Sequence, residues 1–173
     1  MFDSGIKMYG KHATYLKFMS KKTKELNKDA IIAPIFVRYI DTYIAAAIIG
    51  AVQNRRAIRD TESTDSATLF DGQVIGESEK LKLLYRMIIM TDTSMNLSEE
   101  DKINLAFRTT EKEYSTKGME LFTSYVRGGL EWLYEKVTED ATTEEEYLAK
   151  IYEIADEYHF DFGEEIGSID DIF

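Results

Sequence analysis

The segment from Ala33 to Arg56, APIFVRYIDTYIAAAIIGAVQNRR, constrains the fold most strongly because it is apolar on nearly every side. Pro34 is the only proline of the chain, and it suits a first helical turn, where its missing N–H needs no partner. No helix breaker follows until Gly50. A helix that is apolar all round lies in a large core or in a membrane. The unbroken apolar part, Tyr43 to Val52, is too short to cross a bilayer, so we predict a buried central helix over residues 34–56.

Amphipathic segments on both sides of this helix supply the rest of a helical domain. One proline and ten glycines in 173 residues leave little turn chemistry for a many-stranded sheet, and a hydrophobic fraction of 44% is typical of a globular protein. Apolar residues recur at helical spacing in residues 9–27, 77–91, 99–107, 113–138 and in a last segment that ends near residue 158. We therefore predict an all-α single compact domain of about five to seven helices over residues 1–160, followed by an acidic C-terminal tail over residues 161–173.

Three of these segments carry apolar patterns that predict burial. Residues 77–91 have one stripe formed by Leu81, Leu84 and Ile88, and a second beside it formed by Leu83, Met87 and Met90. In residues 99–107 we expect burial of Ile103, Ala106 and Phe107. In the last helix we expect the inward-facing residues to be Leu148, Ile151, Ala155 and Tyr158.

Cap signals and glycines sharpen the helix boundaries. Ser98 precedes three acids, which indicates an N-cap. A calcium loop beginning at Asp92 is excluded, because its sixth and twelfth positions lack the required glycine and glutamate. Thr142 and Thr143 are each followed three residues later by glutamate, as in a capping box. The glycine pair at 128–129 should cost about 1 kcal/mol per residue in mid-helix, so we expect a close helix crossing there, with a kink as the alternative.

The charge of the chain is unevenly distributed. The net charge is −11, yet residues 1–59 hold eleven Lys/Arg against four Asp/Glu, and residues 60–173 hold ten against twenty-eight. In one interpretation the basic half packs against the acidic half within a single fold. In the other, a basic face binds nucleic acid and an acidic face binds a protein partner.

Two groups of cations are candidates for binding nucleic acid or an acidic partner. The first lies in the predicted first helix and comprises Lys21, Lys22 and Lys24; the second follows the central helix and comprises Arg55, Arg56 and Arg59. Both have a structural explanation, because lysine stems cover apolar surface and a helix C-terminus favours cations. Both also suit phosphate, which lysine contacts without sequence choice and arginine binds in a fork.

No motif indicates catalysis or metal binding. His12 and His159 have no partner at ligand spacing, and the chain has no cysteine. No GxSxG elbow occurs, and the glycines at 72 and 76 do not belong to a phosphate loop. We therefore predict that the protein is not an enzyme and uses no cofactor or metal, with a small-ligand or metal-dependent enzyme as the third possibility. The absence of cysteine and of a signal-peptide core favours a cytoplasmic protein without a membrane anchor.

The most specific local motif is the acidic tail ending in Asp170, Asp171, Ile172 and Phe173. It resembles the acidic C-terminal tip of bacterial single-stranded-DNA-binding proteins, although the proline that usually precedes the last phenylalanine is absent. An aromatic ring and a carboxylate can fill a basic-rimmed apolar pocket on a protein partner. The alternative is that the apolar residues of the tail fold back onto the domain.

A longer resemblance covers residues 36 to 137. The stretches YIAAAIIGAVQNRR, LKLLYRMIIM and ELFTSYVRGGLEWLYEK resemble the small helical proteins associated with bacterial DNA-phosphorothioation (Dnd) defence systems. Those proteins have an alanine-rich helix followed by basic residues, and a late helix with a Tyr-x-x-Gly-Gly-hydrophobic-Glu core, here Tyr125 to Glu131. The resemblance implies an accessory role in a DNA-modification or anti-phage locus, and it brings no catalytic residues.

The charge distribution and this resemblance lead to one functional hypothesis and one alternative. The hypothesis is a non-enzymatic accessory subunit of a bacterial DNA-defence or DNA-processing complex, with protein partners and a basic N-terminal half that contacts nucleic acid. The alternative is an acidic phage-type inhibitor or DNA mimic, in which the acidic half occupies the DNA-binding groove of a nucleic-acid enzyme.

Overall fold

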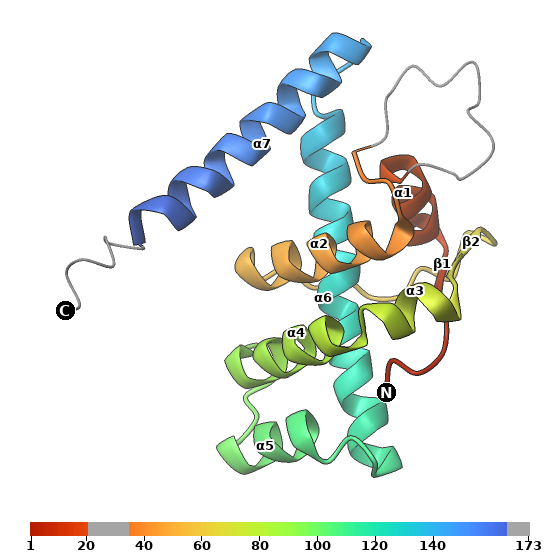
Figure 1. Cartoon of the computed structure of the whole chain (residues 1–173), viewed down its shortest axis with the longest axis vertical. Coiled ribbons are helices and arrows are strands. Elements are labelled where there is room, and N and C mark those ends of the chain that lie inside the picture. Colours follow the sequence, from red (N-terminus) through yellow and green to blue (C-terminus); the bar gives the residue numbers. More distant parts are fainter. Residues whose placement is uncertain (21–34, 166–173) are drawn as a thin grey trace.

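The computed structural model describes residues 1–20 and 35–165, without the side chains of Glu144 and of residues 158–165. The elements in these ranges follow the order β1 (Ile6–Tyr9), α1 (Lys11–Met19), α2 (Tyr39–Val52), β2 (Ser66–Leu69), α3 (Asp71–Gly76), α4 (Ser78–Thr91), α5 (Glu99–Phe107), α6 (Lys112–Thr138) and α7 (Glu144–Glu165). The predicted helical domain is confirmed, and its described part holds seven helices and one small sheet (Figure 1).

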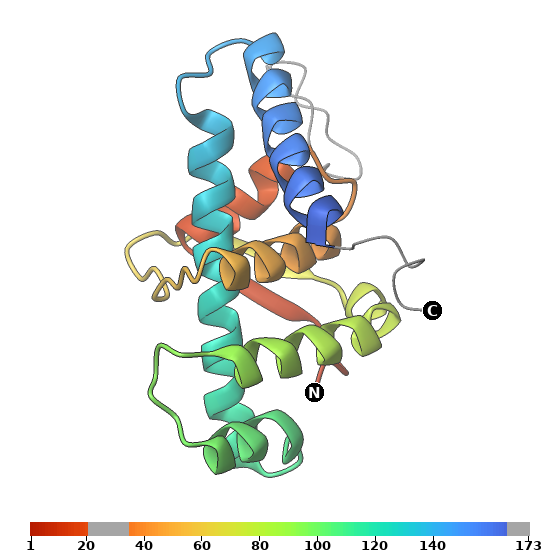
Figure 2. The same cartoon turned by 90° about the vertical axis from the view of Figure 1, so that its left-hand side faces the viewer.

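Helix α6 forms the axis of the molecule, and the other elements are arranged along it (Figures 1 and 2). Its 27 residues span about 40 Å at 1.5 Å per residue. Helix α2 crosses it near its middle, α4 and α5 pack beside its N-terminal half, and α7 turns back from its C-terminal end. Phe122, Val126 and Leu130 of α6 are fully buried, and this helix packs against α1, α2, α4, α5 and α7.

Helix α2 is the buried helix that the apolar segment predicts, but it begins later than predicted. Tyr43, near its middle, has no exposed surface. The helix begins at Tyr39 because Arg38 has an extended backbone (φ −124°, ψ 148°). Just before it, Phe36 donates a backbone hydrogen bond of 2.9 Å to the end of α1, which replaces a helical turn. Pro34 lies outside the described residues.

Glycines allow α2 and α6 to cross at backbone distance. A Cβ atom on Gly129 would lie 1.9 Å from the carbonyl oxygen of Ala46, and one on Gly50 would lie 2.0 Å from that of Tyr125. Any side chain at either position would overlap the facing helix. The close crossing predicted from the glycine pair of α6 is therefore confirmed.

A two-stranded sheet was not predicted from the sequence. Strands β1 and β2 pair antiparallel, with Ile6 opposite Leu69, and both strands have four residues. Runs of that length show neither a helical nor an alternating period clearly, and their partners lie far apart in the chain. Helix α1 begins at Lys11 and not at residue 9, because Gly10 separates it from β1 with a left-handed φ of 65°.

The predicted caps and the glycine interruption are present. Ser98 Oγ accepts a hydrogen bond of 3.1 Å from the backbone N–H of Asp101, which caps α5. Thr143 Oγ1 accepts from the N–H of Glu146 at 3.3 Å, and the carboxylate of Glu146 accepts from the N–H of Thr143 at 2.9 Å. This reciprocal pair is a capping box for α7. Gly76 ends α3 before α4 begins.

Burial on α4 and α5 differs from the prediction. The first apolar stripe of α4 faces the core as expected, but the second is exposed, namely Leu83, Met87 and Met90. On α5 the predicted burial of Ala106 is confirmed, whereas Ile103 and Phe107 are exposed. A periodic pattern shows which residues share a helix face, but it does not show how much of that face a neighbour covers.

Helix α7 also exposes residues that were expected to be buried. Ile151 is half-buried, but Leu148 and Ala155 are exposed, and the side chain of Tyr158 lies outside the description. The helix continues to Glu165, past the predicted boundary between domain and tail. It packs on the C-terminal end of α6, and in Figure 1 it projects away from the body of the molecule.

Candidate anion-binding pocket

The segment that follows α2 runs along α6 as an extended strip. Helix α2 ends at Val52 and not at residue 56, as was predicted. The backbone N–H of Ala57 donates a 2.9 Å hydrogen bond to the carbonyl oxygen of Ser124 in α6. A Cβ atom on Gly128 would lie 2.0 Å from a carbonyl oxygen of this strip, so the first glycine of the pair makes room for it. Residues 53–60 are therefore held against one face of α6.

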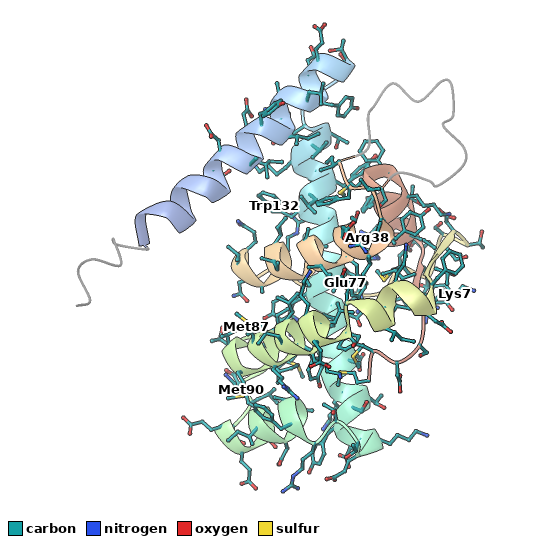
Figure 3. All side chains as sticks on the ribbon, viewed as in Figure 1. Lys7, Arg38, Glu77, Met87, Met90 and Trp132 are labelled. Carbon is teal, nitrogen blue, oxygen red and sulfur yellow. The ribbon has the colours of Figure 1, made fainter. Side chains whose placement is uncertain are left out.

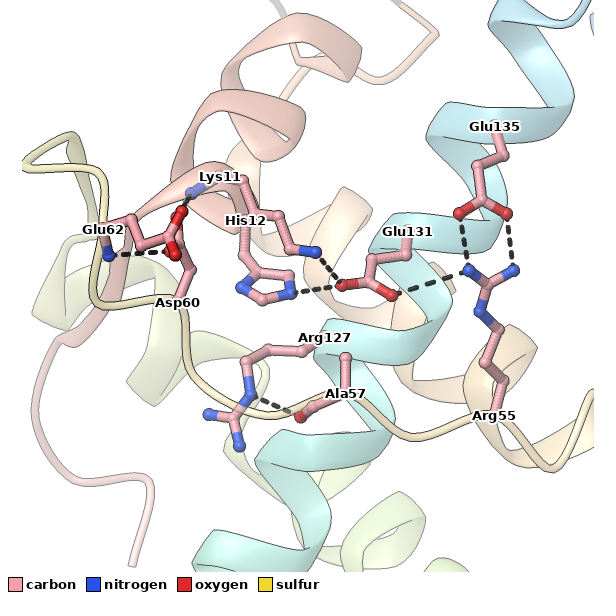
Figure 4. Close-up of polar contacts among 9 residues, drawn as sticks. All are labelled: Lys11, His12, Arg55, Ala57, Asp60, Glu62, Arg127, Glu131 and Glu135. Carbon is pink, nitrogen blue, oxygen red and sulfur yellow. Dashed lines mark hydrogen bonds and ion pairs between the residues drawn. The ribbon is translucent and has the colours of Figure 1, made fainter.

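Glu131 is the centre of an ion-pair cluster on α6 (Figure 4). It lies 2.8 Å from Lys11 Nζ, 3.1 Å from His12 Nε2 and 3.5 Å from Arg55 Nη2. Arg55 also donates two hydrogen bonds of 2.6 Å to Glu135. Burial disfavours the charge of Glu131, but hydrogen bonds from Lys11 and His12 outweigh it and hold its pKa below the usual value. These contacts join the basic N-terminal half to the acidic C-terminal half, as the first interpretation of the charge pattern expects.

His12 is fully buried within this cluster. Burial lowers its pKa, so the ring is neutral at pH 7. A carboxylate can only accept, so the neutral ring carries its proton on Nε2 and donates it to Glu131. Nδ1 has no hydrogen-bond partner among the described residues. His12 is therefore part of the packing between α1 and α6.

A pocket of about 630 Å³ opens beside this cluster, between the extended strip and α6. Its α6 wall is a single helix face formed by Lys117, Glu120, Leu121, Ser124 and Arg127. The opposite wall includes Arg56, Ile58, Arg59 and Met95. The volume is in the range of small-molecule pockets, roughly 300–1,000 Å³. Four lining residues are cations, and Glu120 is the single acid among the described residues that line it.

Arg56 is held in place by a chain of hydrogen bonds that begins at a buried acid. It donates to Ser124 Oγ at 2.9 Å and to Ser94 Oγ at 2.5 Å. Ser94 in turn donates to Asp92 at 2.6 Å, and Tyr125 donates to the same carboxylate at 2.6 Å. Burial disfavours the charge of Asp92, but these two hydrogen bonds outweigh it and lower its pKa. Arg56 is thus oriented without direct neutralisation.

The other cations are likewise not paired with acids. The guanidinium of Arg59 lies 4.1 Å from the ring centroid of Tyr9. Arg127 donates from Nε to the carbonyl oxygen of Ala57 at 2.9 Å, and burial lowers its pKa, although arginine stays charged at neutral pH. Within the described part of the chain, no carboxylate lies within 4.0 Å of the basic nitrogens of Lys117 or of the three arginines. The pocket therefore keeps its positive charge.

The structure separates the predicted binding residues into three groups. Arg56 and Arg59 line the pocket, whereas Arg55 is engaged by Glu135 and Glu131. Two sets of residues lie outside the described residues: Lys21, Lys22 and Lys24, and the tail residues Asp170, Asp171, Ile172 and Phe173.

Sequence reasoning found two of the four cations that line the pocket and missed the other two. Lys117 and Arg127 were not singled out, although ten residues along a helix places them near one face with Leu121 and Ser124 between them. That spacing was the available signal. It could not reveal that residues 56–59 would lie opposite this face, because only tertiary contacts bring the two segments together.

Searches for a metal site, for a membrane-spanning helix and for similar proteins gave no further indication of function. Within residues 1–20 and 35–165, no three His, Cys, Asp or Glu side chains are grouped so that they could hold a metal ion. Among the described helices, none combines the length and the apolar composition that crossing a membrane requires. Comparison with protein-family models, curated proteins and solved structures finds no match to this chain.

Proposed function

We propose that this protein is a non-enzymatic interaction subunit that binds nucleic-acid phosphates through the pocket beside α6. The observation that carries the proposal is a cluster of four cations that have no carboxylate partner among the described residues, in a chain of net charge −11. An acidic protein offers many carboxylates, so cations that remain unpaired create a local positive potential against the overall charge. Such a potential attracts phosphate from solution.

The shape of the pocket favours the nucleic-acid backbone over the bases. Lys117 and Arg127 are ten residues apart on α6, about 15 Å at 1.5 Å per residue. That length corresponds to about four phosphates of one strand of a duplex, at 3.4 Å per nucleotide. No aromatic side chain is among the described lining residues, so bases would have no ring to stack on. Contacts of this kind give affinity without sequence choice.

The resemblance to small Dnd-associated proteins supports a role in a bacterial DNA-defence or DNA-processing complex. In that role the protein contributes binding and not catalysis. A pull-down from the native host, with and without nuclease, separates partners that are bridged by DNA from partners that bind directly. Partners that persist after nuclease treatment bind the protein directly and identify the complex. Partners that disappear are bridged by DNA, which is expected if the pocket binds phosphates.

The direct test is fluorescence anisotropy with a labelled duplex and a labelled single strand over a series of salt concentrations. With four phosphates neutralised, the logarithm of the binding constant should fall with the logarithm of salt concentration at a slope of about −3.6 for duplex. The double variant Arg56→Glu/Arg59→Glu should bind at least about tenfold more weakly. Lys136→Glu makes the same kind of charge change at the far end of α6 and should bind like the wild type.

Two outcomes would overturn the proposal. One is no binding by the wild-type protein at low salt, which would favour the acidic inhibitor, to be tested by competition with DNA for a nucleic-acid enzyme. The other is unchanged affinity of the folded Arg56→Glu/Arg59→Glu variant, which would move the contact away from the pocket. Circular dichroism of the variant shows whether it is folded.

A further inference from the structure

Helices α4 and α7 each present an apolar stripe to solvent on the described surface. On α4 the exposed fractions are 57% for Leu83, 54% for Met87 and 39% for Met90, and Figure 3 shows both methionines toward the C-terminal end of the helix. On α7 they are 40% for Leu148 and 74% for Tyr152. The residues of each set are spaced by three or four, so each set forms a continuous stripe on its helix.

The sequence predicts burial of the α4 stripe and of Leu148, and the described residues of the chain do not bury them. The α4 stripe lies beside residues that do face the core, and Leu148 belongs to the pattern that predicted the buried side of α7. On α7 the small residues Ala149 and Ala155 are exposed near Tyr152, which allows a neighbouring helix to approach closely. Stripes of this kind are typical of surfaces that another helix covers.

The charges around the two stripes are complementary. Helix α4 carries Lys80, Lys82 and Arg86 against Glu79, so it is net basic. Lys80 pairs with Glu77 at 2.9 Å and Lys82 with Glu79 at 2.6 Å, and Arg86 has no carboxylate partner among the described residues. Helix α7 carries Lys150 as its single Lys or Arg and is otherwise acidic, with exposed acids that include Glu145, Glu153, Asp156 and Glu157. A basic helix and an acidic helix whose apolar stripes face each other gain hydrophobic burial and attraction between their rims.

The two helices do not meet within one chain. In Figures 1 and 2 the long axis is vertical, and in both views α4 lies below α7, which packs on the opposite end of α6. Each stripe is therefore left uncovered by the residues that the structure describes. Helix α7 has 22 residues and α4 has 14, about 33 Å and 21 Å, so α7 is long enough to cover the whole of α4.

We propose that the two stripes form a self-association surface, in which α7 of one copy of the chain docks along α4 of a second copy. The same contact is then made twice around a two-fold axis, as in most soluble homodimers. The two contacts together bury Leu83, Met87 and Met90 of both copies against Leu148 and Tyr152. This inference does not depend on the proposed nucleic-acid function, because no residue of either stripe is among the described residues that line the pocket.

The first test is analytical ultracentrifugation of the wild-type protein over a range of concentrations. A dimer should form reversibly, and Met87→Glu or Tyr152→Glu should each weaken it by about 30-fold or more, as for a central interface residue. Ile75→Glu places the same charge on an exposed apolar position of α3, outside both stripes, and should leave the dimer intact. Each variant is first checked by circular dichroism for native helix content.

A charge exchange tests the pairing of α4 with α7 specifically. One variant carries Lys80→Glu and Arg86→Glu, so that both of its helices are acidic. The other carries Glu145→Lys, Glu153→Lys, Asp156→Lys and Glu157→Lys, so that α4 and the part of α7 that bears the stripe, residues 145–157, are both basic. Neither variant should dimerise alone, and an equimolar mixture should form a heterodimer, because both contacts in it join opposite charges. The cysteine-free chain adds a readout: a Met87→Cys copy mixed with a Tyr152→Cys copy should form an intermolecular disulfide under mild oxidation.

Three results would overturn the inference. The first is a wild-type protein that stays monomeric at all concentrations, which would leave the stripes to a different partner protein. The second is a dimer that survives both glutamate variants, which would place the contact on another surface. The third is a mixture of the two charge variants that stays monomeric. None of these results bears on DNA binding, so this inference and the proposed function can fail separately.

Discussion

Helices α2 and α7 both pack against α6, but they do so in different ways. Helix α2 meets α6 backbone to backbone at Gly50 and Gly129, and its sequence is apolar on nearly every side. Helix α7 is attached through side chains. The ring centroid of Tyr147 lies 6.3 Å from that of Phe18 in α1, and Ile154 is partly buried against the core. The first contact tolerates no added atom, whereas the second leaves one apolar stripe uncovered. Fold stability is therefore concentrated at the crossing, and α7 keeps a surface available for association.

The largest effect is expected from Gly129→Ala. In most helices this change stabilises by up to about 1 kcal/mol, but here the new methyl group would lie 1.9 Å from a carbonyl oxygen of α2. The two helices would have to separate, so we expect the free energy of unfolding to fall by about 3 kcal/mol. Urea denaturation followed by circular dichroism measures it.

Gly72→Ala is the matched control for this variant. Gly72 lies in α3, and a Cβ atom there would meet nothing within 4 Å. We expect the ordinary stabilisation of roughly 0.5–1 kcal/mol. Equal effects at both glycines would contradict the idea that the α2–α6 crossing is limited by backbone contact.

The next effect is a pH dependence of stability that arises from the buried His12 of α1. Burial lowers the pKa of His12 in the folded protein, so below its ordinary value of about 6.5 the unfolded chain binds a proton that the folded chain excludes. The stability of the wild type should therefore be fully present above pH 6.5. As the pH falls below that value, it should decrease by up to about 1.4 kcal/mol per pH unit.

His12→Gln should flatten this slope between pH 7 and pH 5, because glutamine does not titrate but can still donate to Glu131. His159→Gln serves as the control, and it should keep the wild-type slope. Urea denaturation at a series of pH values gives both results. If His159→Gln flattened the slope instead, the pH dependence of stability would arise in α7 and not at the contact between α1 and α6.

The smallest effects distinguish the two sides of α7. Ile154→Ala removes a partly buried side chain and should destabilise by about 1–2 kcal/mol, whereas Leu148→Ala on the open stripe should change stability by less than about 0.5 kcal/mol. Both are best measured by thermal or urea unfolding in a Met87→Glu background, so that association does not contribute. A large loss at Leu148 in that background would mean that its stripe is covered within the monomer.

Local patterns were sufficient for most helices. The caps at Ser98 and Thr143 predicted two helix starts correctly, because a cap acts within one turn of the chain. The apolar residues at helical spacing predicted α6. The limits of α2 were wrong at both ends. Its start is set by the contact of Phe36 with α1, and its end by the packing of residues 53–60 on α6, and neither contact is local.

The candidate site was only half predictable for the same reason. Arg56 and Arg59 were found because they follow an apolar helix, but nothing near them in sequence indicates Lys117, Arg127 or the buried Asp92. Arg55 illustrates the reverse case. It belongs to the same run of cations, yet Glu135 and Glu131 occupy it, because helical spacing places both acids on the face of α6 that it meets.

The sequence alone determined that this chain is a helical protein with a buried central helix, a glycine-based crossing and a basic N-terminal half. Those properties follow from periodicity, caps and composition, which act over a few residues. The tertiary structure decided which cations stay unpaired, which apolar stripes stay open and that two distant four-residue strands pair. These outcomes depend on packing between segments that are far apart in the chain, and local sequence patterns do not specify which of these segments meet.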